Sequence, residues 1–190
     1  MVLREQGWDV TVVPVDGFGR ISVEALEKSL RTETALVSVM HANNEVGTVQ
    51  PIREIARLTR ERGIVLHTDA AQSAGKLPLR VDELGVDLLT LAGHKFYAPK
   101  GVGALYVRSG TPIRSVLHGA EQEHGLRPGT ENVASIVALG AAELAAQGSL
   151  LAASAHMREM RDHLHRRLAT AVPELKPNGH PEHRLPNTLH

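Results

Sequence analysis

The sequence predicts an α/β fold in which a mostly parallel sheet lies between helices. Short apolar runs, typical of buried strands, alternate along the chain with segments in which apolar residues recur at helical spacing. Glycines follow several of the helical segments, where they end helices well. With 42% hydrophobic residues, the 190-residue chain can also bury a core. Such an alternation is typical of a parallel sheet with helices on its faces.

The first third of the chain begins this pattern. Residues 1–7 resemble the last turn of a helix, ended by Gly7. Residues 8–15 are rich in β-branched side chains and predict a strand. Ser22 has the character of an N-cap, and the helix that it starts is expected to run to about Leu30.

The middle of the chain holds the clearest alternation. One helix is expected where Ile52, Ile55, Ala56 and Leu58 recur at helical spacing, and Gly63 is expected to end it. Apolar runs predict four further strands, at residues 35–40, 64–67, 86–91 and 103–108. Ligands of such sheets bind beyond the carboxyl ends of the strands, so residues that follow these runs are candidates for a site.

The last third changes character and suggests a domain boundary. We expect a helix over residues 131–147, a break at Gly148 and Ser149, and a second long helix. The second helix carries a stripe of Met157, Met160, Leu164 and Leu168, which we interpret as core packing. Residues 1–148 would form a partial large domain and residues 149–190 the beginning of a small C-terminal domain, with a loop from Pro173 onward.

Composition excludes several classes of partner. Lys plus Arg equals Asp plus Glu, 21 each, which argues against nucleic acid or an anionic membrane surface. No run approaches the roughly 18 apolar residues of a membrane span, and the N-terminus has no signal-peptide pattern. The absence of cysteine excludes disulfides within the chain and fits a cytoplasmic protein.

Asp69 and Lys95 carry the strongest chemical signal, because each follows an apolar strand-like run. A carboxylate in such a place could pair with a protonated pyridine nitrogen, and a lysine beside Phe96 and Tyr97 could attach to an aldehyde. These are the two groups that a pyridoxal phosphate site needs most. Taken singly, Asp69 could instead cap a following helix and Lys95 could be an ordinary surface lysine in a loop.

Four further residues could complete such a site. Gln72 and Asn44 could reach the phenolic oxygen of the cofactor, and His94 could bind its phosphate or lie near its ring. Thr130, just before a predicted helix, could offer a hydroxyl to a phosphate. The alternatives are a turn at Asn44, a loop histidine at His94 and a plain N-cap at Thr130.

Two other sequence patterns resemble known binding sites but do not match them. Gly75-Lys76 ends like a P-loop, but Ala70 occupies the first glycine position and Leu77 the Ser/Thr position. The spacing of histidines and glutamate near residue 121 matches no known metal site, so we expect no metal.

With these residues in place, the whole chain resembles the pyridoxal phosphate-dependent cysteine desulfurases of the class V aminotransferase superfamily, and the related selenocysteine lyases. The resemblance rests on four ordered runs, at residues 41–47, 67–76, 92–108 and 125–132. It implies a three-layer fold of the type I pyridoxal phosphate enzymes.

The resemblance also implies a role for each candidate. Lys95 would bind the cofactor covalently and Asp69 would pair with its ring nitrogen. Gln72 and Asn44 would contact its phenolic oxygen, and His94 its phosphate. In a homodimer, Thr130 would reach the phosphate of the partner's cofactor.

The implied reaction converts L-cysteine to L-alanine and leaves a persulfide on the enzyme, for iron–sulfur cluster assembly or thiolation through an acceptor or scaffold protein. The cysteine that takes the sulfur and the arginine that binds the substrate carboxylate would lie beyond His190, and a stacking histidine before Met1. We therefore expect these 190 residues alone to be inactive. The alternatives are a selenocysteine lyase, another class V enzyme, or an inactive truncated or scaffold form.

Overall fold

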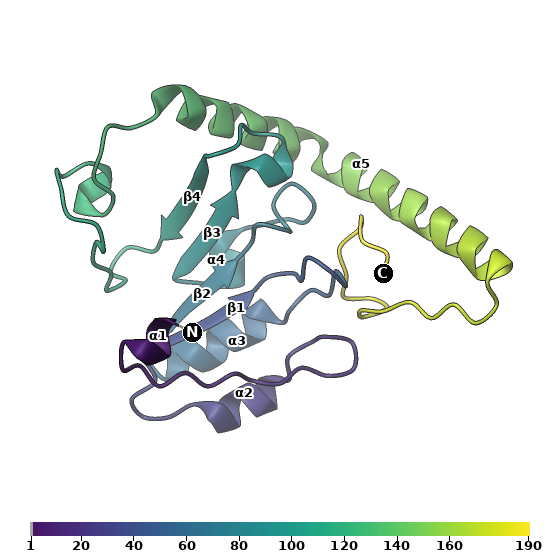
Figure 1. Ribbon diagram of the computed structural model, residues 1–190, viewed down its shortest axis with the longest axis horizontal. Coiled ribbons are helices and arrows are strands. Elements are labelled where there is room, and N and C mark those ends of the chain that lie inside the picture. Colours follow the sequence, from purple (N-terminus) through teal and green to yellow (C-terminus); the bar gives the residue numbers. More distant parts are fainter. Residues whose placement is uncertain (1) are drawn as a thin grey trace.

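The computed structural model describes residues 2–190 and has an α/β architecture, as predicted (Figure 1). Its elements, in chain order, are α1 (Val2–Glu5), α2 (Val23–Ser29), β1 (Leu36–Met40), α3 (Ile52–Glu61), β2 (Val65–Asp69), α4 (Val81–Leu84), β3 (Leu88–Ala92), the 3-10 helix η1 (Gly93–Phe96), β4 (Gly103–Val107), the 3-10 helix η2 (Glu123–Gly125) and α5 (Val133–Ala171).

The four strands form one sheet in the order β1-β2-β3-β4. The first three are parallel, and β4 runs antiparallel to β3. The register places Met40 opposite Asp69, and Asp69 opposite Thr90. The carboxyl ends of the three parallel strands therefore meet at one edge of the sheet, where ligands of such sheets bind.

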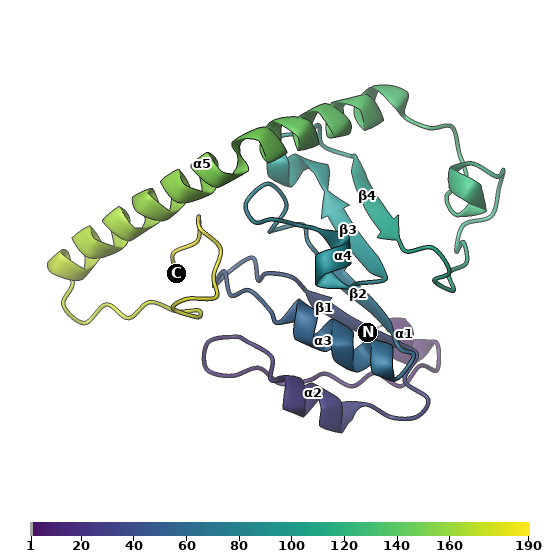
Figure 2. The ribbon, with the colours of Figure 1, turned by 180° about the vertical axis from the view of Figure 1, so that it is seen from behind.

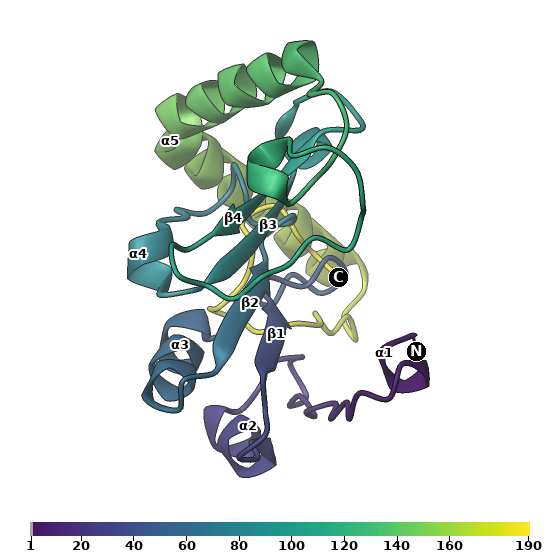
Figure 3. The same cartoon turned by 90° about the vertical axis from the view of Figure 1, so that its left-hand side faces the viewer.

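The hydrophobic core lies on one face of this sheet, under α3 and its neighbours (Figure 2). Ile55 of α3, Leu66 of β2 and Val86 before β3 are fully buried, and burying each such side chain contributes about 2 kcal/mol. Figure 3 shows α2, α3 and α4 together on this side. On the other face, Leu36, Met40 and Leu105 are exposed.

The strand predicted over residues 8–15 is wrong. These residues form no ladder, and only Val15 makes an isolated bridge, to Ile21. Trp8 and Val12 remain exposed. A β-branched composition favours extended backbone, but a strand also needs a neighbour to bond, and β1 pairs with β2 alone.

The predicted helix break at Gly148 is also wrong, because α5 continues through it as one helix of 39 residues. A glycine inside a helix costs only about 1 kcal/mol relative to alanine, which the surrounding alanines and leucines tolerate. The division into residues 1–148 and 149–190 stays a prediction.

The expected burial of the Met/Leu stripe on α5 is wrong for the described chain. Met160, Leu164 and Leu168 are exposed, because α5 extends past the end of the sheet (Figure 1). Among the described helices, α5 is the one long and apolar enough to cross a membrane, with a mean hydropathy of 1.5 over 18 residues. The sequence-based statement that no run approaches a span was therefore too strict, although one such helix does not establish a membrane protein.

The residues after Pro173 form a loop, as predicted, and this loop returns to the sheet. Leu185 donates its backbone N–H to the carbonyl of Gly47 at 2.8 Å, and the side chain of Leu185 is buried. Arg184 forms an isolated bridge with Thr48. The tail thus covers the segment that follows β1, beside the edge at which the parallel strands end.

Candidate active site

Asp69 is the last residue of β2 and its side chain is exposed at the carboxyl edge of the sheet. Its Oδ1 accepts the backbone N–H of Ala71 at 2.8 Å, the bond of an Asx-turn. Its backbone carbonyl accepts the N–H of His41 at 2.7 Å, which ties the end of β1 to the end of β2. The capping alternative is therefore realised as a turn and not as a helix cap, and it occupies one carboxylate oxygen.

The segment after Asp69 is a series of turns. Gln72 is half-buried there, and its backbone carbonyl accepts a hydrogen bond from Lys76 Nζ at 2.9 Å. Gln72 follows Asp69 by three residues, a spacing that in a helix places two residues one turn apart. The bond from Ala74 N–H to the carbonyl of Ala70, at 2.9 Å, gives this segment one such turn without a regular helix.

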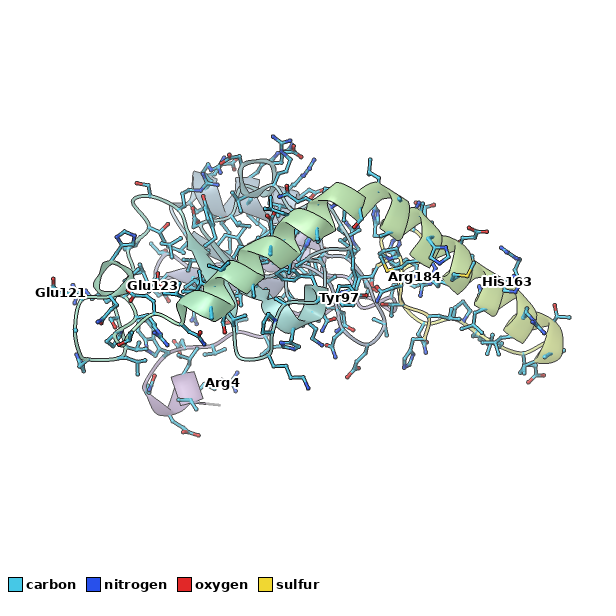
Figure 4. All side chains as sticks on the ribbon, turned by 90° about the horizontal axis from the view of Figure 1, so that it is seen from above. Arg4, Tyr97, Glu121, Glu123, His163 and Arg184 are labelled. Atoms are coloured by element: carbon cyan, nitrogen blue, oxygen red, sulfur yellow. The ribbon has the colours of Figure 1, made fainter. Side chains whose placement is uncertain are left out.

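Lys95 and His94 lie in η1, which begins directly after β3. Both side chains are exposed, while Phe96 is buried at 4% exposure. Tyr97 is 99% exposed and has a φ of 71°, a left-handed backbone that is costly for an aromatic residue (Figure 4). The apolar and aromatic surroundings expected for Lys95 are therefore absent, since one ring points into the core and the other into solvent.

Asn44 follows β1 in a turn and its side chain is exposed. The turn predicted for the Asn43-Asn44 pair is made by Asn43, whose Oδ1 accepts the backbone N–H groups of Glu45 and Val46, each at 2.9 Å. Asn44 is thus not the residue that holds this turn together.

The fold brings five of the predicted residues to one edge, because each lies at or just after the carboxyl end of β1, β2 or β3: Asn44, Asp69, Gln72, His94 and Lys95. Thr130 is not part of this group. It is exposed and precedes α5, whose N-cap is Asn132, which accepts the Ser135 N–H at 3.2 Å. The segment between β4 and α5 lies toward the other end of the sheet, and Figure 4 shows Glu121 and Glu123 of that segment far from Tyr97.

Two histidines support this edge and were not among the predicted site residues. His41 is buried, with its Nδ1 2.8 Å from Ser73 Oγ. Burial, aided by the charge of Arg53, lowers the pKa of His41 to about 4. The imidazole is therefore neutral at physiological pH and links the end of β1 to the turn after Asp69.

The second is His67, which shares a face of β2 with Asp69. Its Nδ1 lies 2.8 Å from Ser38 Oγ and its Nε2 lies 2.9 Å from Thr90 Oγ1, so it bridges three strands. Burial lowers the pKa of His67, and the charge of Asp69 opposes this. The sequence indicates this position for His67, because residues two apart in a strand lie on the same face and His67 precedes Asp69 by two.

An edge of a parallel sheet that presents a carboxylate, an amine, two amides and an imidazole defines an enzyme-like site on an α/β fold. The chain belongs to the aminotransferase class-V family, whose model matches residues 1–190. This family assignment agrees with the resemblance drawn from the four sequence runs.

Relatives and solved structures sharpen the assignment. The chain is 45% identical over 187 residues to the cysteine desulfurase IscS of Dictyoglomus turgidum, covering 98% of this chain and 48% of that protein. A solved NifS-like protein matches with a TM-score of 0.94 and 42% identity, over 99% of this chain and 52% of the other. SspA, solved in complex with cysteine, matches with a TM-score of 0.72 and 46% identity, over 75% of this chain and 42% of the other.

These matches confirm the predicted type I fold, with a mixed sheet flanked by helices. They also confirm the predicted kinship with cysteine desulfurases. The chain spans about half the length of the curated relatives that it matches.

Proposed function

We propose that this chain is part of a pyridoxal phosphate-dependent cysteine desulfurase that acts on L-cysteine. The observation that carries the proposal is the position of Asp69 and Lys95 at the ends of adjacent strands, in a chain 45% identical to a cysteine desulfurase. The IscS relative is named a cysteine desulfurase, and SspA was solved in complex with cysteine, which favours cysteine over selenocysteine as the substrate.

The side chains at this edge fit the cofactor in kind. Asp69 has one carboxylate oxygen bonded to Ala71, and its other oxygen can accept from a pyridinium N–H. Lys95 offers an exposed amine for the aldehyde carbon, and His94 offers an imidazole for the phosphate. When bound, pyridoxal phosphate supplies a cationic ring that withdraws electrons from the substrate α-carbon.

The residues of this chain would hold and assist that chemistry. Asp69 would keep the ring nitrogen protonated, and Gln72 and Asn44 would donate amide N–H groups to the phenolic oxygen. The Lys95 amine would move protons at the substrate α-carbon once it is free. Because these residues lie at the ends of three strands of one sheet, the sheet would hold them in place while the substrate reacts.

Sulfur transfer needs a thiol, which these 190 residues do not contain. In the proposed reaction an enzyme thiol takes the substrate sulfur, so that L-cysteine and the thiol give L-alanine and a persulfide. The 190 residues include no cysteine, so we propose that this thiol is supplied from outside them, as the resemblance also implies for the arginine that binds the substrate carboxylate.

We also propose a cytoplasmic homodimer that passes sulfur to an acceptor or iron–sulfur scaffold protein. Thr130 supports a shared site, because it is exposed and lies between β4 and α5, not after the strands that carry Asp69 and Lys95. In a dimer this hydroxyl could complete the phosphate contacts of the partner's site.

The experiment compares the full-length protein with its Lys95→Ala variant. We expect a visible absorbance band after loading with pyridoxal phosphate, together with equal release of alanine and of sulfur to a thiol, and loss of both in Lys95→Ala. Lys100→Ala, an exposed lysine in the next turn, should behave as wild type. A colourless wild-type protein would reject the cofactor, and a preference for selenocysteine would reject the substrate.

A further inference from the structure

Asn44 lies in a tight hairpin after β1, formed by residues 41–50 (the Asn44 hairpin). Its two arms form an antiparallel bridge, and at its base Gln50 N–H donates to the carbonyl of His41 at 2.9 Å. Because the arms are bonded to each other, a shift of His41 would move Asn44 as well. His41 is therefore the base of the hairpin that carries Asn44.

Gln72 lies in the turn after β2, formed by residues 70–77 (the Gln72 turn), directly before the buried Ser73. Ser73 is the centre of this turn. Its N–H donates to the carbonyl of Ala70 at 3.1 Å, and its own carbonyl accepts the N–H of Leu77 at 2.9 Å. The position of Ser73 therefore sets the point from which the Gln72 side chain extends.

One side-chain contact joins the Asn44 hairpin to the Gln72 turn. His41 Nδ1 lies 2.8 Å from Ser73 Oγ, and the two residues are only 6% and 0% exposed. Burial lowers the pKa of His41 to about 4, so at neutral pH the bond joins two uncharged groups. A hydrogen bond in the interior meets no competing water, so it holds its two segments in one arrangement.

We propose that His41 and Ser73 are positioning residues for the phenolic oxygen of the cofactor: their bond sets the spacing between the side-chain amides of Asn44 and Gln72. The proposal rests on the function proposed above and extends it, because that function gives His41 and Ser73 no role. Two donors aimed at one oxygen bind it well only when both are held in the right geometry. His41 and Ser73 act through the two amides and not on the cofactor itself.

Four variants separate this bond from the general stability that it contributes. His41→Asn can keep the bond, because its amide lies near the position of Nδ1, whereas His41→Leu and Ser73→Ala remove it. Thr59→Val is the matched control, since Thr59 is also buried and its Oγ1 donates to the carbonyl of Ala56 within α3. Thr59 precedes the amino end of β2, away from the edge that carries the site. Thermal unfolding identifies any variant that fails to fold.

The first measurement uses the full-length protein before cofactor is added. Amide hydrogen exchange is followed by mass spectrometry in peptides that cover the Asn44 hairpin and the Gln72 turn. We expect Ser73→Ala to speed exchange in the hairpin about threefold and His41→Leu to do the same in the turn, because each substitution releases the segment in which it does not lie. His41→Asn and Thr59→Val should leave both segments close to wild type.

The second measurement compares pyridoxal phosphate with its deoxy analogue, which lacks only the phenolic hydroxyl group. The dissociation constant of pyridoxal phosphate should rise about tenfold in His41→Leu and in Ser73→Ala, because the phenolic oxygen loses well-placed donors. The dissociation constant of the analogue should change less than about twofold, since it has no such oxygen. Both constants should stay close to wild type in His41→Asn and Thr59→Val.

The proposal is overturned if folded His41→Leu weakens both compounds by the same factor, because a loss of general structure would not distinguish them. Unchanged exchange in the hairpin of Ser73→Ala and in the turn of His41→Leu would overturn it as well. Faster exchange in these variants, in a protein whose wild type binds neither compound, would support the link between His41 and Ser73 and reject the cofactor instead. The two failures are therefore distinguishable.

Discussion

His41 and Ser73, from two different parts of the chain, meet in the interior directly behind the candidate site. Ser73 Oγ donates to the carbonyl of Ala70 at 3.2 Å, so the remaining bond of 2.8 Å is donated by His41 Nδ1 to Ser73 Oγ. This chain of two hydrogen bonds joins the end of β1 to the turn after Asp69. It requires a proton on His41 Nδ1, and because burial lowers the pKa of His41 to about 4, the other ring nitrogen carries no proton at neutral pH.

Stability should fall on acidification because of His41. Its pKa is about 4 in the folded protein against 6.5 for an unperturbed histidine, so below pH 6.5 the unfolded chain binds a proton that the folded chain does not. The free energy of unfolding should drop by roughly 3 kcal/mol between pH 6.5 and pH 4 from this residue alone. Urea unfolding at a series of pH values measures the drop.

The matched variant is His41→Asn, whose amide can still donate to Ser73. It should lose most of the slope between pH 6.5 and 4 while His124→Asn, an exposed histidine, keeps it. A smaller slope should remain from His67, whose pKa is also lowered. Equal slopes in wild type and His41→Asn would show that His41 is not the group that titrates.

Asp69→Asn should separate the structural role of Asp69 from its proposed chemical role. The asparagine Oδ1 can still accept the Ala71 N–H, so the free energy of unfolding should change by less than about 1 kcal/mol. Alanine release should fall about 100-fold or more, because the pyridine nitrogen loses its charged partner. A variant that keeps wild-type turnover would remove Asp69 from the site.

Of the five strands predicted from the sequence, four are present, and so is the edge at which the site residues gather, because buried strands leave a local pattern of apolar residues. It failed for residues 8–15, where a strand depends on a neighbour that composition does not reveal. It also missed the bond between His41 and Ser73, since residues 32 positions apart carry no local sign of contact. At Asp69 the sequence offered a helix cap as the alternative, and the structure has an Asx-turn there instead, because no regular helix follows.

Gly93 should tolerate no side chain. A Cβ there would lie 2.8 Å from the carbonyl oxygen of Val102 and 2.9 Å from Leu139 Cδ1, so Gly93→Ala must displace the backbone just before β4 as well as the Leu139 side chain. We expect a loss of about 1 to 3 kcal/mol in the free energy of unfolding and weaker cofactor binding, because Gly93 begins η1. Gly140→Ala is the control, since its Cβ would meet open space on α5, and it should be neutral or stabilising.

Gly148→Ala tests whether α5 is one helix. In a continuous helix the added methyl group meets open space and lowers the entropy of the unfolded chain, so the free energy of unfolding should rise by about 0.5 to 1 kcal/mol. Gly110→Ala is the contrast, because Gly110 also faces open space but has a φ of +86° and should lose about 1 kcal/mol. Urea unfolding compares the two. If Gly148→Ala destabilises as Gly110→Ala does, the helix ends at Gly148 in solution and the predicted break is restored.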